Sequence, residues 1–564
     1  MPQKTSTISV TRLQHETAGD DHFLIEFPRT NDRGLGKLIM PVAQALDSGQ
    51  CTKKLISQGA DLAPSVAVQQ FEDPNGPIGV LHDLPGWKAD NVFMLPNAIF
   101  GESKTIHVFD PSARAAAHVG SVSGSLAEWK THVATPVGHS YIAATALLSA
   151  FAAPLLPFSK LSEDFIINLA GPSSGGKSTA TLAAYSVWGN PQRMPNWQAT
   201  DRGVEESAAA FNHLLFAIDD LERADRDPKK RVLRLHQNTH TLTSGTTQGY
   251  SGAVTDPSLR LQRFRTITMT SSPYLVEVAC RDMGVLRTDG DRTRLFELRV
   301  PEGKIGGVWA SLKKGSADFD SRAYSDGVRD AAQANFGVAG QAFAEWLVAN
   351  HDRLEWEVNR LTARFMKIAM PGATGVEARI GSKVALLYAG GKLAKKAGLL
   401  SWEPAAVLQT CKWALKEVLD CAFSPLPVKP VAKAIQTFIA DEKLVDAKTD
   451  ANLSDISLPG SRAGFLWRPK KRAYIRYQEL TQVIEGALAE QQGAKLDAKT
   501  MIDELVGRHV IIPQGRNPSS DIRLNGNRQR LVVVDHLELK KMLRRGKKKK
   551  VLKKDRLPGT TANS

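Results

Sequence analysis

With 564 residues, of which 42% are hydrophobic and 23% charged, the chain is long enough for several domains of roughly 100–200 residues each. This composition excludes collagen-like, coiled-coil and low-complexity classes. The formal net charge is +15, and Lys540–Arg556 alone holds eleven basic residues and one Asp. Such a block favours a polyanion, nucleic acid above all, as partner, and a solvated solubility tail is the alternative.

The cysteines and the most apolar segment bear on the compartment. The four cysteines lie far apart without a C-x-x-C pair, as is typical of a reducing cytoplasm, and the first residues lack the apolar stretch of a secretory signal. The apolar segment Tyr141–Phe158 contains Pro154 and Pro157, so we expect a buried helix that ends before Pro154 rather than a membrane span. The sequence therefore predicts a cytoplasmic protein with no membrane partner.

In chain order, residues 1–110 predict a mixed, β-containing N-terminal region. Strand-like runs occur at 23–27 and 37–41, and 92–101 predicts a strand pair around a Pro-Asn turn. From about 125 to 425, long apolar-periodic helices alternate with short apolar strands, a pattern typical of an α/β fold with a parallel sheet.

Further boundaries follow from composition. We expect a P-loop core at 111–300, a helical lid at 301–423 and a linker at 424–430. A winged-helix-like domain is predicted at 431–539, from helices at 431–443 and 496–510, a basic segment at 468–477 and a closing strand at 531–535, followed by a basic disordered tail at 540–564.

The strongest motif is FIINLAGPSSGGKST, in which an apolar strand at 165–170 precedes a G-x-x-x-x-G-K-S loop and a helix. Glycines let the loop wrap around phosphates, and its N–H groups with the helix N-terminus form a positive cradle. Lys177 is expected to reach the β- and γ-phosphates of ATP, and the Ser178 hydroxyl to ligate Mg²⁺. The predicted nucleotide-binding residues are Gly171, Pro172, Ser173, Ser174, Gly175, Gly176, Lys177, Ser178 and Thr179.

Acidic residues follow the next buried strand, at 214–218 in NHLLFAIDDLE. A P-loop that hydrolyses nucleotide needs a carboxylate for magnesium and often a second one to align water. We assign Asp219 to Mg²⁺ and Asp220 to the water. Glu222 is the alternative for the second role.

Two later segments carry candidate catalytic residues. The strand RTITMTSS (265–272) is expected to end beside the two strands that precede the glycine-rich loop and the acidic residues. Its end would present Ser271 or Ser272 to the γ-phosphate or to the attacking water. RTDGDRTRLFELRV then places Arg292 and Arg294 on a predicted loop before a strand. In oligomeric P-loop ATPases an arginine at such a position acts on the neighbouring subunit's nucleotide; an exposed surface arginine is the alternative.

One other pair of residues is a weak candidate. His236 and His240 stand four residues apart in LHQNTH and would share a helical face. No Glu follows the first histidine and no third ligand is near in the sequence, so metal binding is not favoured.

Taken together, the stretches LAEWKTHVATPVGHSYIAATALLSAFAAPLL, GPSSGGKST, WQATDRGVEESAAAFNHLLFAIDDLERAD and RIGSKVALLYAGGKLAKKAGLLSW resemble a bacterial family known as domain of unknown function 927. That family occurs in phages and integrated mobile elements, and some members are related to MCM-like AAA+ replicative helicases. The resemblance covers about residues 20–425 and is most specific over 129–225.

This resemblance implies an AAA+ core with a helical lid. By it, Gly171–Thr179 is the Walker A motif, Asp219 and Asp220 form Walker B, Arg294 is an arginine finger, and Arg379 is a sensor arginine on the lid helix. It also implies a homo-oligomeric ring, a hexamer, that translocates on DNA. The departures are Asp220, where Glu is usual, and the segment 237–258, which contains no Lys or Arg with which a pore loop would grip DNA.

The sequence thus predicts an ATP- and Mg²⁺-dependent DNA helicase of a phage or integrated mobile element, acting on single-stranded or forked DNA in the bacterial cytoplasm. Three alternatives remain: a DNA-bound ATPase switch or loader without translocation, a small-molecule kinase, and a DNA-binding initiator that does not use ATP. The kinase explains neither Arg294, nor a lid with Arg379, nor the basic C-terminus.

Overall fold

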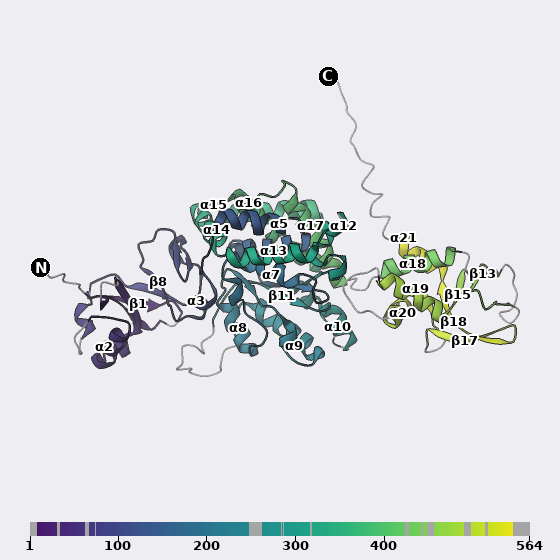
Figure 1. Cartoon of the computed structure of the whole chain (residues 1–564), viewed down its shortest axis with the longest axis horizontal. Coiled ribbons are helices and arrows are strands. Elements are labelled where there is room, and N and C mark those ends of the chain that lie inside the picture. The colour runs from purple at the N-terminus through teal and green to yellow at the C-terminus, as the bar shows by residue number, and fades with distance from the viewer. Residues whose placement is uncertain are drawn as a thin grey trace, which may run out of the picture. The chain divides into compact units, whose positions relative to one another are not determined.

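The computed structural model divides the chain into two compact units, Met1–Ala422 and Phe423–Ser564 (Figure 1). The structure describes residues 8–17, 19–30, 34–61, 67–73, 75–247, 262–283, 285, 287–315, 318–423, 428–441, 444–447, 456–489, 498–513 and 517–544.

The N-terminal region contains two small sheets. The larger has the strand order β3-β2-β1-β4-β8, and the smaller is the meander β5-β6-β7. Pro96 and Asn97 form the turn between β6 and β7, so the predicted strand pair is confirmed. The elements are β1 (Ser9–His15), β2 (Asp21–Pro28), β3 (Leu35–Pro41), α1 (Val42–Ala45), α2 (Ser48–Ser57), β4 (Gly79–His82), β5 (Gly86–Trp87), β6 (Phe93–Leu95), β7 (Ala98–Phe100) and β8 (His107–Phe109).

A parallel four-stranded sheet follows, in the order β10-β11-β9-β12. Every residue of β9 and β11 is buried, as expected for central strands covered by helices on both faces. The elements of this part are α3 (Arg114–His118), α4 (Leu126–Trp129), α5 (Thr135–Val137), α6 (Tyr141–Ala152), β9 (Phe165–Ala170), α7 (Lys177–Tyr185), α8 (Asp201–Ala209), β10 (Leu215–Ala217), α9 (Pro228–Ser244), β11 (Ile267–Ser272), α10 (Val276–Asp282), α11 (Asp289–Arg294) and β12 (Leu295–Arg299).

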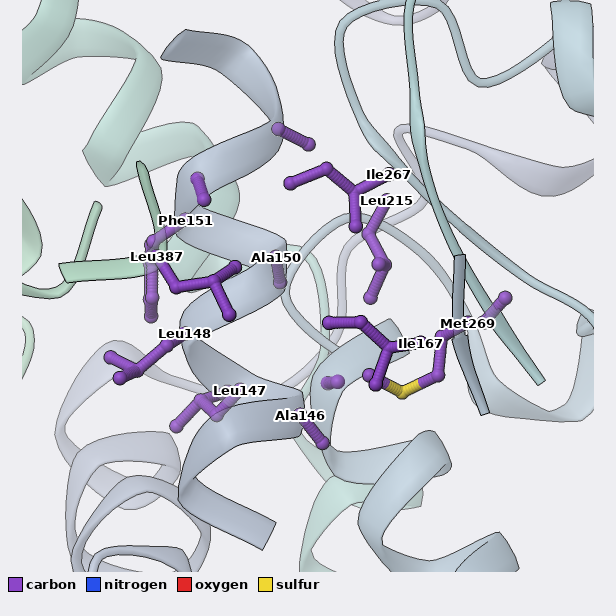
Figure 2. Close-up of a cluster of buried hydrophobic side chains, with 14 of the residues drawn as sticks. Ala146, Leu147, Leu148, Ala150, Phe151, Ile167, Leu215, Ile267, Met269 and Leu387 are labelled. Atoms are coloured by element: carbon purple, nitrogen blue, oxygen red, sulfur yellow. The ribbon is translucent and has the colours of Figure 1, made fainter. Parts of the chain in front are cut away.

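Helix α6 is the centre of the core. Its small residues Ala146 and Ala150 lie toward the sheet residues Ile167 and Ile267, whereas its other side meets Leu387 (Figure 2). Tyr141–Phe158 is apolar and long enough to cross a membrane, but 83% of it is buried in the unit. The α-helix ends at Ala152 and the chain continues as a 3-10 helix, so the predicted buried helix before Pro154 is confirmed.

A helical layer completes the first unit, and α16 packs directly on α6 and α15. The region from 337 to 423, which lies within the predicted helical lid, contains helices and no strand. Its elements, with the two helices that precede them, are α12 (Ala310–Gly315), α13 (Ser321–Ala334), α14 (Val338–Ala349), α15 (His351–Ala369), α16 (Gly375–Lys396) and α17 (Ala406–Phe423).

The second unit packs helices α18, α19 and α20 against a sheet of order β13-β14-β15-β18-β16, with β17 pairing β18. Its small core includes Phe465, Tyr474, Leu531 and Val533. The elements are α18 (Val428–Ala440), β13 (Leu444–Ala447), β14 (Gly464–Trp467), β15 (Arg472–Arg476), α19 (Tyr477–Ala489), α20 (Ala498–Gly507), β16 (Ile511–Ile512), β17 (Ser519–Leu524), β18 (Asn527–Asp535) and α21 (His536–Arg544).

Three predictions about local structure need correction. Helix α18 begins at Val428, inside the predicted linker. Pro430 is tolerated because it lies in the first turn, where a backbone N–H would have no partner within the helix. Helix α21 continues to Arg544, so the start of the predicted disordered tail is helical. Arg292 and Arg294 lie on the helix α11 rather than on a loop, because Thr288 and Asp291 form a capping box that starts it.

Candidate nucleotide-binding site

The loop Gly171–Gly176 joins the carboxyl end of β9 to α7. Gly171 is required by close packing, since a Cβ there would lie 2.2 Å from the Val300 carbonyl oxygen. Gly176 has φ +80°, which favours glycine. Among described residues, no side chain caps the first N–H groups of α7. These N–H groups are therefore available to an anion.

This loop lines an open cavity of about 1030 Å³. The ends of β10 and β11 reach the same cavity, as expected for the carboxyl ends of neighbouring parallel strands. The structure thus brings together the predicted residues Pro172, Ser173, Ser174, Gly175, Gly176, Lys177, Ser178, Thr179, Asp219, Asp220, Glu222 and Ser271.

Lys177 folds back over the loop. Its Nζ donates to the carbonyl oxygens of Gly171 at 2.6 Å and Pro172 at 2.7 Å. Burial lowers the pKa of Lys177, and the carboxylates of Asp219 and Glu222 act against this by favouring the charged form. A phosphate group entering the loop would compete with the two carbonyls for this ammonium group.

Asp219 and Ser271 lie on adjacent strand ends and form a hydrogen bond. The Ser271 hydroxyl donates to Asp219 Oδ1 at 2.6 Å. The serine thereby fixes one carboxylate oxygen, and the carboxylate lines the cavity together with Ser178. A serine hydroxyl and a carboxylate are hard oxygen ligands of the kind that Mg²⁺ prefers, so these residues fit the magnesium site predicted for them.

Asp220 adopts a left-handed conformation, with φ 63°. Its carboxylate forms an ion pair of 2.6 Å with Arg223 on the following turn. Glu222 lines the same cavity. Asp220 and Glu222, the two acids considered for aligning water, therefore both line the cavity. Asp220 can take that role only when its ion pair with Arg223 breaks.

A buried polar network supports the strand ends from behind. Asn168, in the middle of β9, donates to Ser272 Oγ at 2.8 Å and to Glu297 Oε1 at 3.2 Å. Glu297 also accepts from the backbone N–H groups of Val276 and Glu277. Burial raises the pKa of Glu297, and Arg287 opposes that shift. The network fixes the edge of the cavity formed by Ser272.

Arg294 lies at the opposite end of the sheet. It directly precedes β12, whose first residue pairs with Ile166 near the start of β9. The six residues of β9 span roughly 16–20 Å at 3.2–3.4 Å per residue, so Arg294 is about that far from the loop. Its guanidinium forms an ion pair of 2.7 Å with Glu163.

Arg379 also lies near Glu163, beside a second cavity of about 400 Å³ between α15, α16 and 159–163. Lys383, one turn further along α16, binds Glu163 at 3.0 Å and the Thr293 carbonyl at 2.8 Å. Burial alone would raise the pKa of Glu163, but Lys383, Arg294 and Arg379 together lower it. Both predicted arginines therefore gather around one carboxylate, away from the chain's own loop cavity.

Helix α13 contributes residues that no sequence motif indicated. Ser325 accepts from Trp309 Nε1 and donates to Thr179 Oγ1, both at 3.1 Å, which ties this helix to α7. Arg322 and Arg329 line the cavity from the same helix. In the sequence, these residues stand out only as part of the polar face of a helical pattern. Any surface helix has such a face, so the pattern does not indicate a site.

Among the described residues, no cluster of three or more His, Cys, Asp or Glu side chains that could hold a metal ion surrounds the weak candidate pair His236 and His240. His240 instead binds Asp291, the capping residue of α11, at 2.8 Å. Of the segment 237–258, the part up to Ser244 belongs to α9. The rest of the segment, from 248 onward, lies outside the described residues, as do 545–564.

Comparison with known proteins agrees with the predicted resemblance. Residues 7–238 match the model of the family described as domain of unknown function DUF927, which confirms the resemblance over that range. No curated protein sequence matches the chain. Among solved structures, the active helicase Cch of SCCmec type IV is similar in fold, with a TM-score of 0.56, 16% sequence identity and 94% of each chain covered. The mixed α/β architecture is thus shared with a solved helicase over nearly the whole chain.

Proposed function

We propose that this protein is an ATP- and Mg²⁺-dependent AAA+ motor that acts on DNA, a helicase of a phage or integrated mobile element working in the bacterial cytoplasm. The observation that carries the proposal is the cavity in which the loop 171–179, Asp219 and Ser271 meet. The order of the sheet supports it, because β11 lies between β9, which leads into the loop, and β10, which is followed by Asp219. Ser271, at the end of β11, would therefore lie between the bound phosphates and the Asp219 carboxylate.

In this proposal each group has one task. Loop N–H groups and Lys177 bind the phosphates, and Ser178 and Asp219 hold Mg²⁺, which neutralises phosphate charge. Ser271 orients Asp219. Asp220, or Glu222 in its place, aligns the attacking water. In the first case Asp220 exchanges its ion pair with Arg223 for that water.

Arg294 is assigned to a neighbouring subunit's nucleotide, and Arg379 is assigned the role of sensor arginine on the lid helix α16. The separation of Arg294 from its own loop, about the length of β9, supports action in trans. A closed ring, a hexamer, gives every cavity such a neighbour. In the isolated chain Glu163 pairs with Arg294, so assembly must redirect this arginine toward the adjacent phosphates.

DNA is the proposed partner because of the basic C-terminus and the fold shared with the Cch helicase. In the second unit three helices precede a β-hairpin, which supports a winged-helix type of domain. The alternative, an ATPase switch that binds DNA without moving along it, is favoured by one observation: the segment 237–258 has no Lys or Arg.

The deciding experiment is strand separation on forked DNA. Full-length protein with ATP and Mg²⁺ should release the labelled strand, whereas a non-hydrolysable ATP analogue should not support release. ATP hydrolysis that is stimulated by DNA but accompanied by no strand release would favour the switch. Absence of hydrolysis under all conditions would contradict the motor altogether.

A further inference from the structure

The hairpin β17–β18 in the second unit carries a basic face that the sequence motifs did not indicate. Its two-residue turn is Asn525-Gly526, and both residues have positive φ, 43° and 79°. This is the geometry of a type I′ turn, which closes a tight, twisted ribbon. The hairpin is thus a defined two-stranded element rather than a loop.

One side of the ribbon anchors it to the unit. Leu524 and Leu531 are buried in the small core, and Ile522 packs against the same cluster. Because strand side chains alternate, the residues between them face outward. The outward side therefore has a fixed position relative to the core of this unit.

The outward side is dominated by arginine. Arg523 pairs directly with Arg528 across the two strands, and Asp521 pairs with Arg530. All four side chains are exposed. Like charges directly opposite one another on a sheet are unfavourable, by roughly 0.2–1 kcal/mol. Among the described residues, neither Arg523 nor Arg528 forms an ion pair with an acidic side chain, so no such pair there offsets the repulsion.

Arg530 is held in place. Its Nε donates to Ser519 Oγ at 3.1 Å, and its guanidinium carbon lies 5.2 Å from the centre of the Tyr477 ring. Stacking leaves the charge of the guanidinium intact while it restricts the side chain. The face thus presents three arginines and one Asp on a rigid ribbon.

We propose that this face, Arg523, Arg528 and Arg530, contacts the phosphate backbone of duplex DNA. A phosphate bound at each of Arg523 and Arg528 places an anion beside each guanidinium and offsets their mutual repulsion. A two-stranded ribbon also has a width that the major groove of B-DNA admits. The inference deepens the proposed function by naming the surface that holds DNA, and it rests on DNA being the partner.

The test is a salt titration of fluorescent-duplex anisotropy with the full-length chain. Each phosphate contact contributes about −0.9 to the slope of log affinity against log salt. The double variant Arg523→Ala with Arg528→Ala should therefore have a slope about 1.8 smaller in magnitude than the wild type. Over a fourfold rise in salt, the wild type should lose about 12-fold more affinity than the variant.

Three controls make the result specific. Arg508→Ala with Lys416→Ala removes the same charge from residues paired with Glu504 and Asp420, and this variant should keep the wild-type slope. Arg523→Lys with Arg528→Lys should also keep it, because charge rather than shape is needed. Lys470→Ala with Lys471→Ala tests the other basic turn of this unit.

The outcomes separate the two proposals. A wild-type slope in the Arg523/Arg528 alanine variant, or a drop found only in the Lys470/Lys471 variant, would overturn the hairpin assignment. A different result would overturn DNA as the partner of this face: single-stranded RNA or heparin binds the wild type as strongly as duplex DNA does, and the Arg523/Arg528 alanine variant shows the same decrease in salt slope with those ligands. Strand release from forked DNA is measured separately, so its failure bears on the motor and leaves the slope result standing.

Discussion

Lys177 is bonded to two carbonyls of its own loop, Gly171 and Pro172. Pro172 lines an open cavity that water enters, so loss of the ammonium group leaves its carbonyl hydrated rather than buried and unpaired. The fold should therefore tolerate removal of this side chain, whereas phosphate binding should not.

We expect Lys177→Ala to lower ATP hydrolysis by roughly 10²- to 10³-fold, as is typical when one preorganised donor to a developing charge is removed. Circular dichroism and thermal unfolding should be close to wild type. Lys304→Ala is the matched control, because Lys304 lines the same cavity but is largely exposed and paired with Glu302. Equal hydrolysis by the two variants would contradict the role of Lys177.

Asp219 and Asp220 are adjacent but differ in environment, so their substitutions should have different effects on nucleotide binding and on hydrolysis. Asp219→Asn should weaken Mg²⁺-dependent nucleotide binding and abolish hydrolysis, since it also disturbs the hydrogen bond from Ser271. Asp220→Asn should bind nucleotide normally and hydrolyse it slowly. Titration with a fluorescent ATP analogue, with and without Mg²⁺, measures the first effect, and steady-state hydrolysis measures the second. If Glu222→Gln reduces hydrolysis more than Asp220→Asn does, Glu222 is the residue that aligns water.

At the scale of elements, the strands of the core were predictable, whereas helix α11 and the hairpin β17–β18 were missed. The strand Phe165–Ala170 and its loop follow from an apolar run and a glycine pattern, and both have the predicted bounds. Helix α11 was missed because its capping box, Thr288 with Asp291, uses the shorter acid instead of the usual Glu or Gln. The hairpin β17–β18 had a local signal, Asn525-Gly526, that strand prediction alone did not use.

Contacts across distant segments carry no such signal. Glu163, Arg294 and Lys383 span 220 residues of sequence, and the packing of α11 on α16 and on β9 brings them together. The hydrogen bond that ties α13 to α7 likewise joins segments that are far apart in the sequence, and no local pattern predicts it. Sequence motifs thus located the loop and acids of the candidate site, while its supporting side chains required the fold.

His213 joins two elements, and its titration should be visible in stability. The Trp87 N–H of β5 donates to His213 Nδ1 at 3.0 Å, in the turn before β10. Desolvation lowers the pKa of His213 to about 3 from an ordinary value of 6.5. Between those values the unfolded chain takes up a proton that the folded chain does not, so stability should fall as pH falls below 6.5, by about 1.4 kcal/mol per pH unit at most.

The comparison variant is His213→Asn, because asparagine tolerates the positive φ of 59° at this position and does not titrate. Urea unfolding followed by tryptophan fluorescence at pH 7.5 and pH 5 should show a loss in the wild type that exceeds the loss in the variant by about 2 kcal/mol. Identical losses would show that His213 does not couple folding to pH.

At the scale of the whole molecule, one chain holds the candidate nucleotide site and the arginines proposed to complete it at opposite ends of one sheet. The loop cavity lies at the carboxyl ends of the strands, and Arg294 with Arg379 lies at the amino ends around Glu163. Neither arginine lines the loop cavity of its own chain. A second copy that presents its Arg294 end to this cavity would complete the site, and repetition of that contact closes a ring.

Mixing two inactive variants tests this arrangement. Lys177→Ala lacks a working loop but keeps Arg294, whereas Arg294→Ala keeps the loop but lacks the arginine, so each alone should be inactive. When equal amounts assemble at random, about one interface in four combines an intact loop with an intact arginine, and hydrolysis should return to at most about a quarter of the wild-type rate. Arg292→Ala in place of Arg294→Ala is the control, since Arg292 is held by Glu277 and Asp289 and should remain active by itself. If analytical ultracentrifugation shows co-assembly of the two variants but hydrolysis stays absent, Arg294 does not act on the neighbour's nucleotide.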